Sequence, residues 1–553
     1  MSQSPAATAT SQNVQSCRLL QVPAEILDRI TWHLTTPELC NLRITCKSIE
    51  EALYYSFTAE FFTRKQFMVS EFSLRALRDI SKSRLAGHLR HVHFGLEQID
   101  IHDAPRMHSG QTSPQIHADY MRIFSQRLIE QETLWLFGVF PKYLAEAFGR
   151  LPNLESVTVR DFNSNRRSRD GPHAHWLSYG TQTMIKETSI RPRTHGIPGH
   201  SIHTYVDQMF KSIIHALGMA NARPTAIEVM ERQGHPLGDA AFHMHPDFEA
   251  SIIPVLRGLK RLHLTLQGNS SALVNDGLPH QRHGLTMFLR HCEGLEELRI
   301  NGRHGAGTYA IRNSLRNLYD WLTVEESTSE TEAQKEANSP SLDGRTSDLS
   351  LVNSPIKFPQ LQNISLGMTS LTINELVRLV AKFADTLQHL ELWRITLVTE
   401  EGRSFDRGEV LEDRQILFAH LLKKLLKIPN LNLRHIKLGN MKQIWNPVDG
   451  HGHMMEDVSF KPNAKTRDED VDAGIESVIG VLEYTGPDWR HFVTYEMIPR
   501  FYTRRAKVDE EESQDEDGEN DEDGEDDEDE EDEDNDDDDD NDDADNMDQD
   551  EES

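Results

Sequence analysis

The stretch LKRLHL, residues 259–264, has apolar side chains in its first, fourth and sixth places and polar side chains between them. Alternation of apolar and polar residues over its second half predicts a short strand with one buried face. The same six-residue frame recurs at seven further places: LRHVHF (89–94), LESVTV (154–159), PTAIEV (224–229, with proline in the first place), LEELRI (295–300), LQNISL (361–366), LQHLEL (387–392) and LRHIKL (433–438).

Helical patterns lie between these frames. Residues 206–217 carry a wide apolar stripe, and 376–383 and 417–425 carry narrower stripes at steps of three and four residues. Successive frames start 26 to 70 residues apart, with several distances near 35 or twice that value. The chain therefore alternates predicted strands with predicted helices, which favours the α/β class.

This alternation resembles an irregular leucine-rich-repeat solenoid, and we expect it to cover residues 70–505. The asparagine that usually follows the strand in the regular repeat is missing from most copies, so we expect long, irregular repeats. In such an array each unit buries its apolar face only against its neighbours, which leaves one long concave surface.

The N-terminal stretch VPAEILDRITWHLTTPELCNLRITCK, residues 22–47, has a different pattern. Pro23 suits a first helical turn because its missing N–H would be unpaired there. Apolar residues follow at helical spacing, and Thr35–Pro37 predicts a break before a second helix. A third short helix is expected before Leu53. A segment this short cannot bury all these apolar side chains by itself.

Residues 18–62 resemble the F-box: a Pro-x-Glu-Ile start, a first helix with Ile and Leu, a Leu-x-x-Leu second helix and a following Cys-Lys. Val22 stands where the family usually has leucine, and Ile49 stands where an aromatic residue is common. The resemblance implies docking on the Skp-type adaptor of a Skp–cullin–F-box ubiquitin ligase, and through that adaptor on a cullin. The residues expected to carry the adaptor contact, shared with the F-box's own packing, are Val22, Pro23, Ile26, Leu27, Ile30, Leu34, Leu39 and Leu42.

The negative charge of the chain is concentrated at its C-terminal end. Residues 509–553 contain 33 Asp and Glu among 45 residues and no Lys, Arg or His, which leaves 57 acidic against 58 basic residues in 1–508. We expect this tail to be disordered, and it is either simply solvated, a weak binder of basic proteins, or a mask for basic patches of its own chain. A nearly neutral body gives no case for nucleic-acid binding.

The remaining low-complexity segments and the cysteines indicate which parts are disordered and which kinds of site are not expected. Residues 1–17 and 325–355 are expected to be disordered because they are rich in small and polar residues, and 163–173 is expected to be a polar loop. Four cysteines are too few and scattered for a disulfide framework or a zinc site. No apolar run approaches the length of a membrane span, and no secretory signal is apparent, so we expect a soluble protein of the cytoplasm or nucleus.

No pattern in the sequence predicts an enzyme, and no cofactor or metal is expected. The histidines of HMHPD (243–247) could ligate a catalytic metal at a strand end, but solvated loop histidines are the favoured interpretation. We therefore expect a non-catalytic substrate receptor that holds a target protein for ubiquitination, with the target and its binding residues open. The alternatives are an acidic-tailed scaffold or chaperone for basic proteins and, third, a metal hydrolase that uses His243 and His245.

Overall fold

The computed structural model of the chain describes residues 18–103, 114–163, 168–171, 176–194, 203–232, 236–267, 283–303, 315–324, 356–399, 416–445, 454–462 and 479–505. The chain divides into two compact units, Met1–Arg504 and Arg505–Ser553, and the following concerns the first. The lead-in 1–17, the predicted insertion 325–355 and the tail 509–553 lie outside the described residues. Helices and strands alternate along the described part, so the predicted α/β class is confirmed.

Four short helices at the N-terminus form what we call the helical head: α1 (Ala24–Thr31), α2 (Thr36–Arg43), α3 (Lys47–Ala52) and α4 (Tyr54–Phe62). Pro23 is the residue before α1 and does not lie inside its first turn. The predicted break is present, because the backbone N–H of Thr35 donates to Oε2 of Glu38 at 2.9 Å in a capping box that starts α2. The head has a small core of its own, made by Leu27, Leu39, Ile49, Leu53 and Phe61.

A ten-stranded sheet forms the centre of what we call the sheet body, residues 64–505. Its strands, in spatial order, are β1 (Arg64–Met68), β2 (His91–Gly95), β3 (Ser156–Arg160), β4 (Ala226–Met230), β5 (Arg261–Gln267), β6 (Glu297–Arg303), β7 (Asn363–Gly367), β9 (His389–Trp393), β11 (His435–Gly439) and β14 (Val481–Thr485). Neighbours from β1 to β11 pair in parallel, and β14 closes the far edge in the antiparallel direction.

All eight frames form strands of this sheet, as predicted. Each strand begins at the third residue of its frame, and the pairing keeps the frames in phase: Arg261 lies opposite Glu297, which lies opposite Asn363. The fourth and sixth residues of the frames, such as Leu262 and Leu264, are therefore aligned in two buried rows. Constant register follows because a shift by one residue would turn these apolar rows to the other face.

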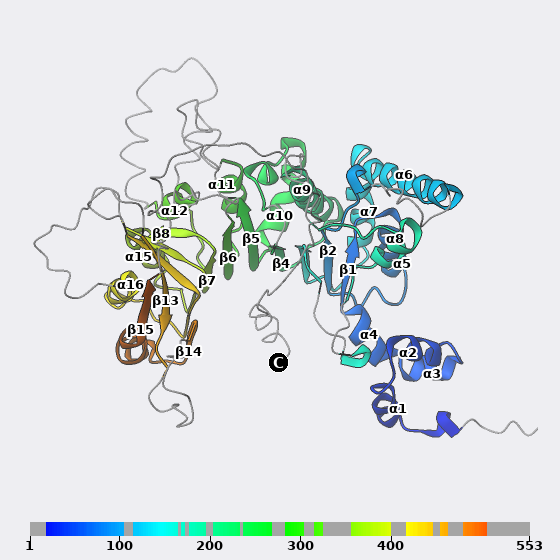
Figure 1. Cartoon of the computed structure of the whole chain (residues 1–553), viewed down its shortest axis with the longest axis horizontal. Helices are drawn as coiled ribbons and strands as arrows, with labels where there is room; N and C mark the ends of the chain where they lie inside the picture. Colours follow the sequence, from blue (N-terminus) through cyan, green and yellow to red (C-terminus); the bar gives the residue numbers. More distant parts are fainter. Residues whose placement is uncertain are drawn as a thin grey trace, which may run out of the picture. The chain divides into compact units, whose positions relative to one another are not determined.

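Helices line one side of the main sheet (Figure 1). The predicted helices within 206–217, 376–383 and 417–425 are α9, α15 and α16. The helices of the sheet body are α5 (Glu71–Ser81), α6 (Pro114–Leu136), α7 (Val139–Phe148), α8 (Thr181–Thr188), α9 (His203–Ala220), α10 (Pro246–Arg257), α11 (His283–Arg290), α12 (Arg316–Leu322), α15 (Ile373–Lys382), α16 (Leu417–Leu425) and α17 (Trp489–Phe492). Together with the buried strand rows most of these helices form one apolar core, while Phe124 of α6 and Met184 of α8 pack in a small separate cluster with Met68 and Ile99. Among the described residues, no helix is long and apolar enough to cross a membrane.

A second sheet accompanies the C-terminal strands. It has the order β15 (Phe501–Arg505), β13 (Met454–Phe460), β12 (Met441–Trp445), β10 (Thr396–Val398) and β8 (Ser370–Thr372). β8, β10 and β12 follow directly on main-sheet strands, after corner residues Met368, Arg394 and Asn440 with φ of 50°, 50° and 49°. The chain thus turns through a left-handed residue and starts a second parallel ladder.

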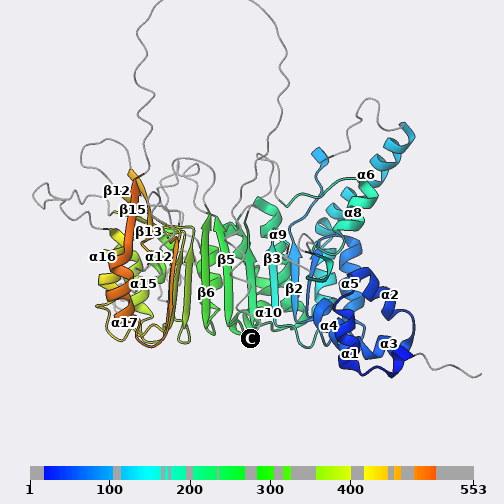
Figure 2. The same cartoon turned by 60° about the horizontal axis from the view of Figure 1, so that its bottom comes forward.

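The start of the sheet body requires a correction. We expected the repeat region to begin at residue 70, but β1 already pairs with β2 along Arg64–Met68. RKQFM lacks the six-residue frame, because Lys65 replaces the first apolar residue of the strand. The helical head lies beside the β1 end of the sheet, and α4 contacts β1 directly (Figure 2).

Candidate functional site

The side of the main sheet opposite the helices carries a polar surface, which we call the polar face. Alternate residues of each strand belong to it, because the residues between them are buried against the helices. In the eight frames these are the third and fifth places, which the repeat does not restrict to apolar residues. They include His91, Arg261, Glu297, His389 and His435 in the first row, and His93, Glu228, His263, Arg299, Glu391 and Lys437 in the second.

One group of charges on the polar face links β4, β5 and β6. The Arg261 guanidinium lies 3.4 Å from Oε1 of Glu228 and 3.3 Å from Oε2 of Glu297. Nε2 of His263 lies 2.6 Å from Oε1 of Glu297. Burial alone would raise the pKa of Glu297, but His263 and Arg261 outweigh it, so this pKa is lowered. Arg261 and His263 of β5 thus lie between a carboxyl group of β4 and one of β6.

A second group links β9, β11 and β14. The rings of His389 and His435 stack with centroids 5.6 Å apart. Nε2 of His435 lies 3.5 Å from Oε1 of Glu391, and this neighbour lowers the pKa of Glu391 to about 2. Lys437 Nζ lies 3.2 Å from Oε2 of Glu483. Burial, followed by the nearby His435, lowers the pKa of His389, so this ring is neutral at neutral pH.

The polar face brings together charged side chains from neighbouring strands. Its carboxylates, imidazoles and guanidinium group come from strands that lie side by side. A partner bound across these strands would form ion pairs with side chains of several strands at once. Rigid strands hold these side chains in place, so little conformational entropy is lost when a partner binds.

The helical head divides the predicted adaptor residues into three sets. Leu27 and Leu39 lie in the core of the head. Val22, Leu34 and Leu42 are partly buried against that core. Pro23, Ile26 and Ile30 are exposed, the two isoleucines by 45% and 43%. The exposed set alone is free to contact a partner without disturbing the head's own packing.

Sequence reasoning missed further exposed apolar side chains of the head. Trp32 follows α1, Ile44 follows α2, and Tyr55 lies near the start of α4. All three are strongly exposed, Ile44 by 82%. Helical periodicity could not identify them, because Trp32 and Ile44 follow the ends of helices.

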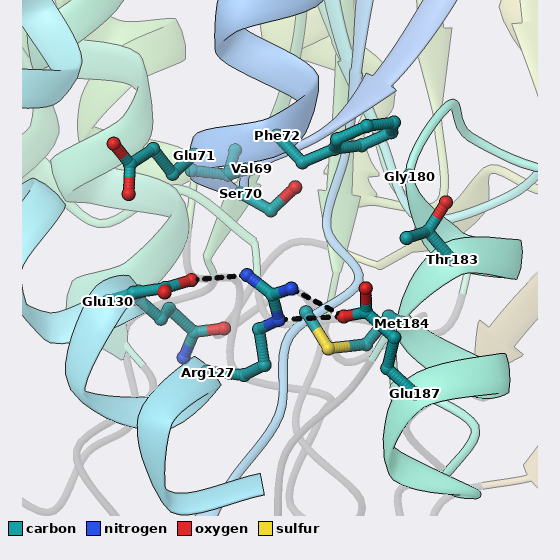
Figure 3. A pocket seen from close by; sticks show the side chains of 11 residues that line it. Val69, Ser70, Glu71, Phe72, Arg127, Glu130, Gly180, Thr183, Met184 and Glu187 are labelled. Carbon is teal, nitrogen blue, oxygen red and sulfur yellow. Dashed lines mark hydrogen bonds and ion pairs between the residues drawn. The ribbon is translucent and has the colours of Figure 1, made fainter. Parts of the chain in front are cut away.

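A hollow between α5, α6 and α8 is already filled by an ion-paired arginine (Figure 3). Arg127 Nη1 donates to Oε2 of Glu130 at 2.6 Å, and its Nε and Nη2 donate to Oε2 of Glu187 at 2.8 and 2.5 Å. The hollow is thus a packing contact that ties α6 to α8.

The two histidines considered as metal ligands lie at the start of a helix rather than at a strand end. His243 and His245 precede α10, and Nδ1 of His245 accepts a hydrogen bond from the Asp247 backbone N–H at 3.2 Å. Within the described residues, no group of three His, Cys, Asp or Glu side chains is arranged to hold a metal ion. The similar pair His451 and His453 lies outside those residues.

Comparison with known proteins adds no relative. No protein-family model matches the sequence, and a search of curated proteins also finds no match.

Proposed function

We propose that the chain is the substrate-recognition subunit of a Skp–cullin–F-box ubiquitin ligase. In this proposal the helical head is an F-box that binds a Skp-type adaptor, and the sheet body is a leucine-rich-repeat-like solenoid that binds the target protein. The chain itself carries out no chemistry. It raises the effective concentration of a target lysine near the ubiquitin-charged enzyme, which other subunits supply.

The observation that carries this proposal is the exposed apolar surface of the helical head. Ile26 and Ile30 lie one helical turn apart on α1 and are nearly half exposed, while Leu27 between them is buried. The head thus keeps its own core and still presents apolar area to solvent. Covering that area with a partner would contribute favourable free energy of roughly 25 cal/mol per Å².

Binding to a purified Skp-type adaptor tests the proposal. We expect the double substitution Ile26→Asp and Ile30→Asp to weaken binding more than about tenfold, because charge replaces the apolar contact. Leu34 is a poorer choice, since it packs against the head's own core and a charge there would also unfold the head.

A matched control is Ile129→Asp on α6, where an isoleucine is 61% exposed far along the chain from the head. This variant should bind the adaptor as the unsubstituted chain does. Undiminished binding by the double variant, with helical content retained, would refute the proposed function.

A further inference from the structure

A segment that follows β3 joins the helical head to the sheet body. We call it the strap; it comprises residues 168–171 and 176–180 of the described chain. The predicted polar loop, 163–173, includes only the first part of the strap. One end of the strap contacts three helices of the head, and the other end pairs with the edge strand β1.

Arg169 of the strap binds the end of α1 and the side of α4. Its Nη1 donates to the carbonyl oxygens of Thr31 at 2.6 Å and Leu34 at 2.9 Å. Its Nε and Nη2 donate to the two carboxylate oxygens of Glu60 at 2.6 and 2.5 Å. The guanidinium is only 7% exposed. Carbonyls at a helix C-terminus lack helical partners, and a cation there is favourable.

The next residue, Asp170, binds the opposite kind of helix end. Its Oδ1 accepts a hydrogen bond from the Thr36 backbone N–H at 2.7 Å, and its Oδ2 accepts one from the Thr36 hydroxyl at 2.5 Å. Thr36 is the first residue of α2, and negative charge is favourable at the N-terminal end of a helix. Adjacent residues of opposite charge therefore complement the facing ends of α1 and α2.

The second half of the strap continues the main sheet. The Tyr179 backbone N–H donates to the Gln66 carbonyl at 2.8 Å, and the Met68 N–H donates to the Tyr179 carbonyl at 3.1 Å. The Tyr179 ring stacks on Phe72 with centroids 5.4 Å apart. Gly180 has φ of +105°, and a Cβ there would lie 2.1 Å from Oγ of Ser73, so only glycine fits.

Between these two halves, Trp176 stacks on Phe61 of α4 with centroids 5.7 Å apart. The strap thus covers part of an edge strand that would otherwise offer unpaired backbone groups to other chains. The same segment is bonded to the head through side chains and to the sheet through its backbone.

We propose that the strap holds the helical head and the sheet body in one fixed orientation, with Arg169 as its principal positioning residue. Small neighbouring domains ordinarily move relative to each other unless their interface is large. In place of a large area, Arg169 forms charge-assisted hydrogen bonds to two carbonyl oxygens and one carboxylate of the head. The consequence rests on the proposed function: a fixed orientation sets the distance between the adaptor surface and the polar face.

A spin-label distance measurement on the full chain tests the strap. One label is placed on Cys46, which is exposed before α3, and the other on Lys211→Cys, on the exposed side of α9. Cys17 and Cys40 are replaced by serine, while the buried Cys292 is left in place. We expect a single narrow distribution of label-to-label distances in the otherwise unsubstituted chain. In Arg169→Ala we expect this distribution to broaden. A distribution equally narrow in Arg169→Ala would overturn the proposal.

The matched control is Arg150→Ala, which removes an arginine whose Nη1 donates only within its own turn, to the Glu146 carbonyl at 3.0 Å. The distribution of label-to-label distances in Arg150→Ala should stay narrow. A second variant, Glu60→Gln on α4, keeps the shape of the partner of Arg169 and removes its charge. We expect a broadened distance distribution, and an unchanged distribution refutes the role of the ion pair.

Helical content and adaptor binding separate loss of orientation from loss of folding. Arg169→Ala should keep both, because Arg169 lies outside the head's apolar core and outside its exposed surface. If Arg169→Ala unfolds the head, the distance in Glu60→Gln decides the proposal. A chain that never binds the adaptor contradicts the proposed function alone, since the distance measurement uses no partner.

Discussion

Glu231, the residue that follows β4, is a carboxylic acid almost fully enclosed by the sheet body. It is 4% exposed, and neither of its carboxylate oxygens has a hydrogen-bond partner among the residues that the structure describes. Burial, together with the negative Asp161 and Asp207, raises its pKa well above the ordinary value, while Arg303 acts in the opposite direction. An enclosed carboxyl group without hydrogen bonds is stable there only in its neutral form.

We predict that Glu231→Gln stabilises the protein at pH 8, by roughly 1–3 kcal/mol, because glutamine is neutral and folding then no longer has to protonate this carboxyl group or bury its charge. A raised folded-state pKa means that the folded chain holds a proton that the unfolded chain releases above its pKa of 4.5. The stabilising effect of that proton is present below pH 4.5 and is lost as the pH rises through the folded-state pKa. Denaturant unfolding of both proteins at pH 5 and pH 8 measures the effect.

A carboxylate on the same strand provides the comparison. Glu228 accepts a hydrogen bond from Thr158 at 3.1 Å and pairs with Arg261, so Glu228→Gln should destabilise at both pH values. If Glu231→Gln also destabilises at pH 8, Glu231 must be a partnered anion and the prediction fails.

At the scale of elements, two of the three corners between the sheets hold residues in a backbone conformation that costs them free energy. Met368 and Arg394 have left-handed backbone conformations, which glycine and asparagine adopt more easily than other residues. The third corner already has an asparagine, Asn440. The Arg394 N–H donates to the Gly439 carbonyl at 2.9 Å, so the corner conformation is held by the next strand.

We predict that Arg394→Asn raises the free energy of unfolding by roughly 1 kcal/mol, because asparagine lowers the cost of the left-handed conformation. Arg394 is exposed, so little packing is lost. Thermal unfolding measures the change. Arg394→Ala should give no gain, because alanine has the same backbone restriction as arginine; equal gains in both variants would mean that loss of the arginine side chain, and not the corner, is responsible.

At the scale of the whole molecule, charge is divided between a nearly neutral body and the acidic residues 509–553. We predict that a chain ending at Val508 keeps adaptor binding and loses weak binding to basic proteins. The tail's attraction is electrostatic and falls as the screening length shortens from about 10 Å at 0.1 M salt to about 3 Å at 1 M. Capture of partners by both chains at low and high salt measures this.

Partners that survive both truncation and high salt belong to the sheet body. Loss of every partner on truncation, even at low salt, would instead favour the alternative of an acidic-tailed scaffold for basic proteins.

Much of the fold could be predicted because its signals are local. The frame that LKRLHL represents specifies a buried row and an open row within six residues, so all eight copies could be assigned as strands. β1 could not, since RKQFM lacks the frame and gains its structure from pairing with β2. β14 was also missed, although IGVLEY (479–484) has apolar residues in the first, fourth and sixth places of the frame. The three-residue strands β8 and β10 have no signal of their own and exist because the corners bring them side by side.

The candidate site was less accessible to sequence reasoning. Periodicity identified the apolar residues of the head but could not say that Leu27 faces inward and Ile30 outward, because both fit one amphipathic stripe. The polar face was implied by the open places of the frame, although its charge pairs join residues about one repeat apart, such as Glu228 and Arg261.

By itself, the sequence determined the α/β class, the strand positions, the helical head and the separation of charge into a terminal tail, because each of these depends on residues close together in the chain. Only the tertiary structure decided the second sheet, the enclosure of Glu231 and the role of Arg169. The guanidinium of Arg169 meets Thr31, Leu34 and Glu60, which lie more than a hundred residues earlier. No local pattern records such a contact, because its free energy exists only when folding has brought the two segments together.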